Sequence, residues 1–470
     1  MPRMEKNLKD LEIVDLEYTG HGVAKPENGP VIFVEDVLPG EVVHARVHKK
    51  KKRFAFAHPV EFVTRSPDRV APFCRHFEHC GGCKWQFLEY AEQCRYKKYF
   101  VEQIFDRLAA VPRPVVPDVM PSRSDRFYRN RLDFSFSNRR WLTPAEIESD
   151  DVFSARDALG FHVKGSFDKV LQISECFLLD QLSDRIRNTV CTYARERGDL
   201  FYDPVENAGD LRSLIIRTSR NGGVMVILVL GTERDDLAAC YEVMFRDTFP
   251  EITSFYVGVN TSRNDTLQNA RLTLRYGEAD IVETLLGIDF SIRPQSFFQT
   301  NPDQAERLYD LVREWANLDG SQIVYDLYCG AGSIALLVAT AASHVYGVEN
   351  VPEAIDAARM NQEANNIENC TFLCGSVENV LSTTYPGGFQ RPDLVILDPP
   401  RAGLHPAVVK TLLREKPPRI IYVSCKPSTQ ARDVAMLSEA YDLVRIQPVD
   451  MFPQTYHIEN VVELVLKSGK

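Results

Sequence analysis

The amino-terminal part of the chain alternates apolar and polar residues in short runs. These runs cover residues 11–18, 30–36, 41–49 and 54–63. Glycine, proline and asparagine separate them, and alternation bounded by such turn residues is typical of half-buried β-strands. The pattern predicts a small antiparallel barrel, and its length and turn spacing fit the OB-like class.

The middle part of the chain begins with a helical pattern and then becomes irregular. Residues 87–110 place apolar side chains every three or four positions, which predicts one long amphipathic helix. Prolines follow this segment and end it. Between residues 118 and 276, strand-like and helix-like segments mix without a regular order. The mixture predicts a central α+β domain, with the 87–110 helix available to pack on the next domain.

From residue 281 onward, strand-like segments alternate with amphipathic helices. Several of the strand-like segments are uninterrupted apolar runs, which are typical of a parallel sheet buried on both faces. The alternation predicts a doubly wound, Rossmann-like α/β domain. Its strands are expected at residues 323–329, 344–350, 370–376, 393–400, 419–425 and 461–467.

These patterns divide the 470 residues into a barrel at 1–66, a central α+β domain at 67–280 and a Rossmann-like domain at 281–470. No apolar run approaches the roughly 20 residues that span a bilayer. The amino-terminal segment also lacks the apolar core of a secretory signal. We therefore expect a cytoplasmic protein that does not enter a membrane.

Positive charge gathers in two places, although the formal net charge is −10. Residues 44–53 form a dense basic run on the last barrel hairpin, and residues 123–131 hold four arginines with aromatic residues between them. Either patch alone is as often a solvated face as a binding site. Together they predict two surfaces able to hold an anionic polymer.

A glycine-containing turn follows the first Rossmann-like strand. Gly330 and Gly332 open a helix and fit the G-x-G-x-x-A fingerprint of dinucleotide sites, in which Glu349 would bind ribose hydroxyls. An NAD-dependent oxidoreductase is therefore one interpretation. However, Asp326 stands four residues before the first glycine, where its carboxylate suits the cationic amino acid portion of S-adenosylmethionine. Asp398 then begins an Asp-Pro-Pro corner at the expected ligand edge of the sheet, which also favours S-adenosylmethionine.

A cysteine, Cys425, ends the next predicted strand and faces the same edge. A thiolate that adds to C6 of a uracil makes C5 nucleophilic enough to accept a methyl group, and the charge of Lys426 favours the thiolate. The C5 proton must then be removed by a general base. Glu459 is the best candidate, and His457 is the competing one. The alternative interpretation of Cys425 is an inert buried thiol.

The chain holds eleven cysteines without an export signal, so a disulfide framework is not expected. Cys74, Cys80 and Cys83 follow the spacing C-x5-C-x2-C around a double glycine, which predicts a metal site that needs a fourth ligand. Cys176 is preferred to Cys94 because Cys94 lies within the predicted helix. Zinc and a [4Fe-4S] cluster both accept four thiolates, and the spacing does not separate them.

Four segments occur in one order along the carboxyl-terminal half: DLYCGAGSIAL, LDPPRAGL, YVSCKPSTQARD and DMFPQTYHIENVVEL. Together they resemble the RNA uracil-C5 methyltransferases that act on ribosomal and transfer RNA. The amino-terminal barrel resembles the TRAM-type RNA-binding domain of that family. The cysteine motif resembles that of the subset with a [4Fe-4S] cluster.

This resemblance implies an S-adenosylmethionine-dependent enzyme that forms 5-methyluridine in structured RNA, in 23S rRNA before tRNA, with no protein partner. It implies Cys425 as nucleophile and Glu459 as proton acceptor. Ser333 stands where some members have asparagine, and Ser376 stands where the family has an acidic residue. The positions implied to contact cofactor or target base are Gln299, Asp326, Tyr328, Gly330, Gly332, Ser333, Glu349, Ser376 and Asp398.

Other classes of protein remain open from the residues alone. A cytosine-C5 RNA methyltransferase also uses cysteine attack at C6, but its cysteines stand in different motifs. An exocyclic-amine methyltransferase would follow the Pro-Pro corner with an aromatic residue, and Arg401 stands there instead. The remote alternatives are the NAD-dependent oxidoreductase and a non-catalytic RNA-binding iron-sulfur protein.

Overall fold

The amino-terminal strands form one curled, six-stranded sheet with the order β1-β5-β6-β4-β3-β2. Alternate side chains of β4 and β6, such as Ile32, Val34 and Ala57, fill a separate small core. The strands predicted at 30–36, 41–49 and 54–63 are confirmed, but the run at 11–18 is divided between β1 and β2, and β4 and β6 pair in parallel rather than antiparallel. This arises because β6 folds back on β5 as a hairpin and returns beside β4. The strands are β1 (Asn7–Glu12), β2 (Asp15–Leu16), β3 (Gly22–Ala24), β4 (Val31–Val34), β5 (Val42–Lys50) and β6 (Phe54–Thr64).

The structure is a computed structural model, and it describes residues 7–27, 29–109, 111–149, 156–264, 266–384 and 390–468. No helix within these ranges is both long and apolar enough to cross a membrane.

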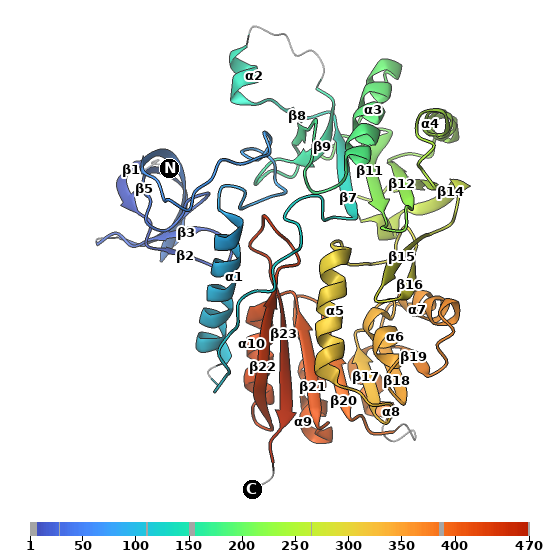
Figure 1. The fold of residues 1–470 in the computed structure, drawn as a ribbon. Coiled ribbons are helices and arrows are strands. Elements are labelled where there is room, and N and C mark those ends of the chain that lie inside the picture. Colours follow the sequence, from blue (N-terminus) through green and yellow to red (C-terminus); the bar gives the residue numbers. More distant parts are fainter. Residues whose placement is uncertain are drawn as a thin grey trace.

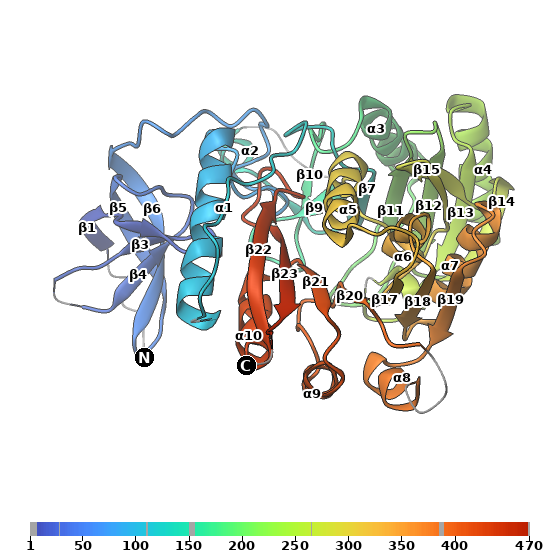
Figure 2. The same cartoon turned by 60° about the horizontal axis from the view of Figure 1, so that its bottom comes forward.

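One helix, α1 (Tyr90–Ile104), lies between the barrel and the carboxyl-terminal domain in both views (Figures 1 and 2). It begins three residues later than the predicted 87–110 segment, because Phe87 and Leu88 are already buried in the preceding turn. It continues into a π-helical turn, η1 (Phe105–Ala109), and residue 110 lies outside the described residues. Both α1 and η1 contact α10 (Pro427–Leu437).

The central domain contains an eight-stranded sheet with the order β14-β13-β12-β11-β7-β9-β10-β8. Helices α3 and α4 cover one face, where Ile186 and Phe245 pack against sheet residues such as Phe134. The other face packs on the next domain through Met225 and Ile227, so every residue of β12 is buried. Its elements are β7 (Arg131–Ser137), β8 (Arg140–Trp141), α2 (Pro144–Glu148), β9 (Ala158–His162), β10 (Val170–Gln172), α3 (Gln181–Arg197), β11 (Leu211–Thr218), β12 (Val224–Leu230), α4 (Asp235–Thr248), β13 (Ser254–Val259), η2 (Leu267–Asn269) and β14 (Arg271–Gly277).

The carboxyl-terminal sheet has seven strands in the order β19-β18-β17-β20-β21-β23-β22. Of these strands, β23 alone runs in the direction opposite to all the others. Apolar runs such as β20 are buried on both faces, which confirms the predicted Rossmann-like fold. Because β17 to β21 are parallel, their carboxyl ends share one edge of the sheet. The strands are β17 (Ile323–Leu327), β18 (His344–Glu349), β19 (Cys370–Cys374), β20 (Leu394–Leu397), β21 (Arg419–Ser424), β22 (Tyr441–Val449) and β23 (Glu459–Leu466).

Two features of this domain were not predicted. Strand β22 pairs with β23 at the sheet edge, and a hairpin precedes the sheet where strand–helix alternation was expected to begin. The hairpin strands are β15 (Ile281–Leu285) and β16 (Ile288–Ile292), and the helices are α5 (Pro302–Ala316), α6 (Ser333–Ala339), α7 (Pro352–Ala364), α8 (Val377–Thr384), α9 (Pro406–Glu415) and α10.

Candidate active site

The turn from β17 into α6 forms one wall of the site. Tyr328, Gly330 and Gly332 all have positive φ, at 68°, 54° and 81°. A Cβ on Gly332 would come within 3.0 Å of Phe372 and 3.1 Å of Ala358, so packing and backbone both favour glycine there. A Cβ on Gly330 would meet no described atom within 4 Å. The turn therefore leaves open space beside Gly330, where a cofactor can approach the backbone.

A carboxylate and a hydroxyl lie at the carboxyl ends of two adjacent strands beside this turn. Glu349, the last residue of β18, accepts hydrogen bonds from the backbone N–H groups of Gly330 (3.2 Å) and Asn350 (2.7 Å). Ser376 follows β19, and its buried hydroxyl has no hydrogen-bond partner among the described residues. Both side chains can form further hydrogen bonds with the hydroxyl or amino groups of a bound ligand.

Asp326 is a buried carboxyl group that lacks a cation. Both of its oxygens are buried, and neither has a hydrogen-bond partner in the part of the chain that the structure describes. Burial, followed by the charges of Asp398 and Glu349, raises the pKa of Asp326 to about 8. Burial also raises the pKa of Asp398 to about 7. A cationic ligand would restore the ionised forms, so this cluster fits the ammonium and sulfonium groups of S-adenosylmethionine.

Cys425 follows β21 at the same edge and is partly buried. Burial, then the charges of Glu459 and Asp398, raise the pKa of its thiol to about 11, while the charge and hydrogen bond of Arg401 act in the opposite direction. The sequence predicted Lys426 as the cation that favours the thiolate. Its side chain is exposed, and Arg401 of the Asp-Pro-Pro-Arg corner is the cation that acts on Cys425.

Glu459 is the first residue of β23, which pairs with β21, and it is 4% exposed. Burial and the charge of Asp398 raise its pKa well above the ordinary value. Burial, followed by the charge of Arg401, instead lowers the pKa of His457 to about 4. A group with such a low pKa is a weak base at neutral pH, so the electrostatics favour Glu459 over His457 as the proton acceptor.

Tyr309 of α5 was not predicted from the sequence. Its pKa is raised by burial and by Asp398, while hydrogen bonds with Gln299 and Ser333 lower it. Tyr309 therefore lies close to Gln299 in the loop before α5 and to Ser333 at the start of α6. The helical periodicity of α5 marks Tyr309 only as a core position, so the sequence carries no signal for this contact.

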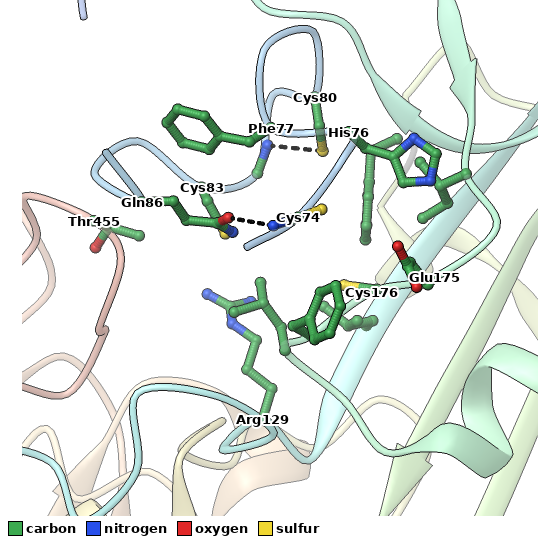
Figure 3. A pocket seen from close by; sticks show the side chains of 16 residues that line it. Cys74, His76, Phe77, Cys80, Cys83, Gln86, Arg129, Glu175, Cys176 and Thr455 are labelled. Atoms are coloured by element: carbon green, nitrogen blue, oxygen red, sulfur yellow. Dashed lines mark hydrogen bonds between the residues drawn. The ribbon is translucent and has the colours of Figure 1, made fainter. Parts of the chain in front are cut away.

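Four cysteines line one cavity of about 110 Å³ (Figure 3). Cys74, Cys80 and Cys83 come from the loop before α1, and Cys176 comes from the segment after β10. Cys94 lies on α1 and is not part of the lining. Burial raises the pKa of the Cys83 and Cys176 thiols to about 12. Within the described ranges, no three cysteine, histidine or acidic residues are grouped as ligands of a single metal ion.

The fold and the edge of the sheet define a class of protein. Three features define this class: a parallel sheet with one antiparallel strand, a glycine turn, and an unpaired buried acid beside that turn. They are the features of an S-adenosylmethionine-dependent methyltransferase.

Comparison with known proteins identifies the family. Residues 283–467 match the model for tRNA (Uracil-5-)-methyltransferase, and residues 2–60 match the TRAM domain. An uncharacterized RNA methyltransferase of Bacteroides thetaiotaomicron is 44% identical over 95% of this chain and 99% of its own length. Another from Halalkalibacterium halodurans is 36% identical over 99% of both chains.

A solved structure is similar along nearly the whole chain. It is the Pyrococcus abyssi tRNA (uracil-54, C5)-methyltransferase in complex with S-adenosyl-L-homocysteine, with a TM-score of 0.75 and 31% identity over 97% of this chain and 100% of that one. The chain belongs to the RNA uracil-5-methyltransferase family, with an amino-terminal TRAM domain. The predicted enzyme class and its methyl donor, S-adenosylmethionine, are thereby confirmed.

Proposed function

We propose that this enzyme forms 5-methyluridine in structured RNA by transient covalent attachment of the target base to Cys425. The observation that carries the proposal is the grouping of Cys425, Glu459, Asp398 and Arg401, whose charges act on one another near the buried carboxyl group of Asp326. Bound S-adenosylmethionine supplies an electrophilic methyl group. The protein must supply a nucleophile, a base and a place for the uracil ring.

The residues divide these tasks. Cys425 releases its proton to solvent, the charge of Arg401 favours the resulting thiolate, and its sulfur adds to C6 of the uracil. The electron pair then available at C5 takes the methyl group. Ionised Glu459 accepts the C5 proton, and the C5–C6 double bond re-forms as the bond from sulfur to C6 breaks. A raised pKa suits Glu459 to this task, because it makes the ionised carboxylate a stronger base.

Asp326 is proposed to hold the amino acid portion of the cofactor. Charge-assisted hydrogen bonds to a buried group are worth about 1.5–3 kcal/mol, so Asp326→Asn is expected to weaken S-adenosylmethionine binding about 10- to 100-fold. Isothermal titration calorimetry measures the change. Asp310→Asn on α5, where the side chain is 52% exposed, is the matched control and is expected to bind normally. Equal affinity of Asp326→Asn and the native enzyme would contradict this role.

The substrate proposed first is 23S rRNA, because the cysteine motif resembles the iron-sulfur subset of the family. Transfer RNA is the second candidate, since the similar Pyrococcus enzyme is a tRNA (uracil-54, C5)-methyltransferase. Mass mapping of 5-methyluridine in both RNAs from a strain that lacks this protein separates the two. The modification is expected to vanish at a 23S rRNA position and to persist in tRNA.

The TRAM barrel offers a surface for this RNA. Phe33, Phe54 and Phe56 lie on the face of the sheet opposite its small core, with ring centroids 5.5 to 5.6 Å apart. The ammonium of Lys49 lies 5.9 Å from the centre of the Phe56 ring, and the basic run continues to Arg53. Aromatic rings beside positive charge suit unpaired bases and their phosphates.

Substitution of Phe54 and Phe56 together by alanine tests this surface. Each stacked base is worth about 1–3 kcal/mol, so the double variant is expected to bind RNA at least about tenfold more weakly. Filter binding at two salt concentrations measures the affinity. Val60→Ala, at an exposed site on the same strand, serves as the control. Unchanged affinity in the double variant would place the RNA elsewhere.

The cysteine-lined cavity is proposed to hold a [4Fe-4S] cluster. A zinc ion would draw four thiolates to within about 2.3 Å of a single centre. The four thiols surround a cavity of about 110 Å³, which suits a group of several atoms. Burial also raises the pKa of Cys83 and Cys176 to about 12, so a cationic group bound in the cavity would favour their thiolates.

Cys176→Ala is expected to remove the visible absorbance of protein purified without oxygen, because the cluster loses one of four ligands. Iron and sulfide analysis quantifies the loss. Cys94→Ala is the control and is expected to keep the cluster. Colourless native protein that contains zinc would exclude the iron-sulfur assignment.

A further inference from the structure

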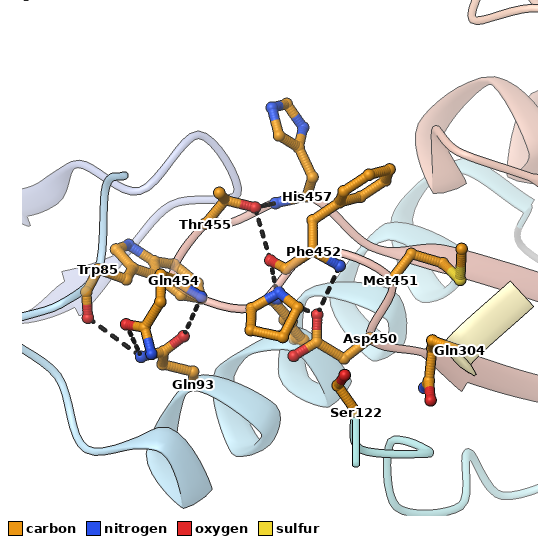
Figure 4. Close-up of polar contacts among 12 residues, drawn as sticks. Trp85, Gln93, Ser122, Gln304, Asp450, Met451, Phe452, Gln454, Thr455 and His457 are labelled. Carbon is orange, nitrogen blue, oxygen red and sulfur yellow. Dashed lines mark hydrogen bonds and ion pairs between the residues drawn. The ribbon is translucent and has the colours of Figure 1, made fainter. Parts of the chain in front are cut away.

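The loop of residues 450–458 directly precedes the proposed base, Glu459, and Figure 4 shows its polar contacts with the segments around it. It connects β22 to β23, and the strand pair closes at Val449 opposite Glu459. His457 lies near its end. The placement of Glu459 therefore depends on the shape of this 450–458 loop as well as on β23.

Gln93 of α1 holds the middle of the loop. Its side chain is fully buried, and its oxygen accepts the backbone N–H of Gln454 at 2.9 Å. Its amide nitrogen donates to the side-chain oxygen of Gln454 at 3.0 Å and to the carbonyl of Trp85 at 3.1 Å. Gln454 has a φ of 66°, a conformation that non-glycine residues keep only when their surroundings impose it. The contacts of Gln93 supply that constraint.

An ion pair fixes the start of the loop. Lys97, one turn after Gln93, places its ammonium 2.6 Å from the carboxylate of Asp450, and both side chains are fully buried. The same ammonium donates to the carbonyl of Phe452 at 3.1 Å, and the hydroxyl of Tyr90 donates to Asp450 at 3.0 Å. Satisfied buried charges of this kind fix geometry strongly. One helix thus anchors the loop at two points.

The cysteine motif meets the loop at the same place. The backbone N–H groups of Lys84 and Trp85, directly after Cys83, donate to the carbonyl of Gln454 at 2.8 and 3.0 Å. The next residue, Thr455, lines the cysteine cavity. The segment at Gln454 and Thr455 therefore lies between the cavity and the last part of the loop, which leads to Glu459.

We infer that Gln93 is a positioning residue that ties the 450–458 loop to the cysteine motif. Through this connection, binding or loss of a group in the cysteine-lined cavity alters the placement of Glu459. The inference rests on the proposed function, because it takes Glu459 as the base and the cavity as a ligand site. Its test uses hydrogen exchange, which does not depend on methylation. A failure of the proposed chemistry and a failure of the coupling are thereby separated.

Gln93→Met removes the hydrogen bonds but keeps the side-chain volume. Amides of residues 451–458 are expected to exchange about tenfold faster, because the backbone of Gln454 loses a buried partner. The kcat for methylation is expected to fall about tenfold while KM for S-adenosylmethionine stays unchanged. Gln103→Ala is the control, because the side chain of Gln103 accepts a hydrogen bond from Arg107 on the same helical segment, a contact that does not involve the loop. Unchanged exchange, or faster exchange with native kcat, would overturn the positioning role.

A double-mutant cycle tests the link to the cavity. Cys83→Ser in the full-length protein is expected to speed exchange of residues 451–458, and adding Gln93→Met is expected to produce less than the product of the two separate effects. If the two changes in exchange rate instead multiply, the two residues act independently and the coupling is contradicted. Native exchange of the 451–458 amides in Cys83→Ser would overturn it as well.

Discussion

Cys425→Ala is expected to reduce 5-methyluridine formation by about 10⁴-fold or more, because the variant lacks the sulfur that adds to C6 in the proposed mechanism. Arg401 and Asp398 stay in place, so binding of S-adenosylmethionine is expected to be retained. Tritium release from C5-labelled RNA and nucleoside mass spectrometry measure the activity. The variant is also expected to form no covalent complex with RNA.

Cys374→Ala is a suitable control for this experiment. Cys374 ends the parallel strand β19 at the same edge of the sheet, but its side chain is exposed. Its replacement is expected to leave activity within about twofold of native, as for most exposed substitutions. Full activity of Cys425→Ala would remove covalent catalysis from the proposal.

Glu459→Gln is expected to stop the reaction after methyl transfer. The amide cannot accept the C5 proton, so the methylated base stays bonded to Cys425 and turnover falls by about 10²- to 10⁴-fold. Denaturing gel electrophoresis should show a protein–RNA complex, and mass spectrometry of the linked peptide should find a methylated uridine on Cys425.

His457→Gln provides the comparison for the adduct experiment. Its imidazole has a pKa lowered to about 4 by burial and neighbouring cations, so its loss is expected to leave elimination largely intact. An adduct that accumulates with His457→Gln and not with Glu459→Gln would assign the base to the histidine. Absence of an adduct with a confirmed RNA substrate would contradict the reaction order.

The sequence predicts those parts of the fold that depend on local pattern. Apolar runs such as 323–327 and 419–424 mark strands buried on both faces, and parallel strands must bring their carboxyl ends to one edge. That geometry alone places Asp326, Asp398 and Cys425 together. The cysteine spacing likewise predicts a common site, and the structure brings Cys176 to the other three around one cavity.

Other features depend on contacts between distant segments, for which the sequence carries no local signal. Lys426 adjoins Cys425 in sequence, yet its side chain is exposed and Arg401 from a neighbouring strand end supplies the charge. Tyr309 looks like an ordinary core residue of α5. Strand β22 has scattered polar residues because it lies at the sheet edge, and it was therefore not predicted as part of the sheet.

Helix α1 has a further consequence for how the enzyme selects a uridine. One side of the helix touches the barrel, where Tyr99 donates a hydrogen bond to Asp15 at 3.3 Å, and another side holds the 450–458 loop through Gln93 and Lys97. The barrel and the loop that leads to Glu459 are thus held by the same helix. In the proposed function, α1 therefore sets the spacing between RNA bound on the barrel and the base at Glu459.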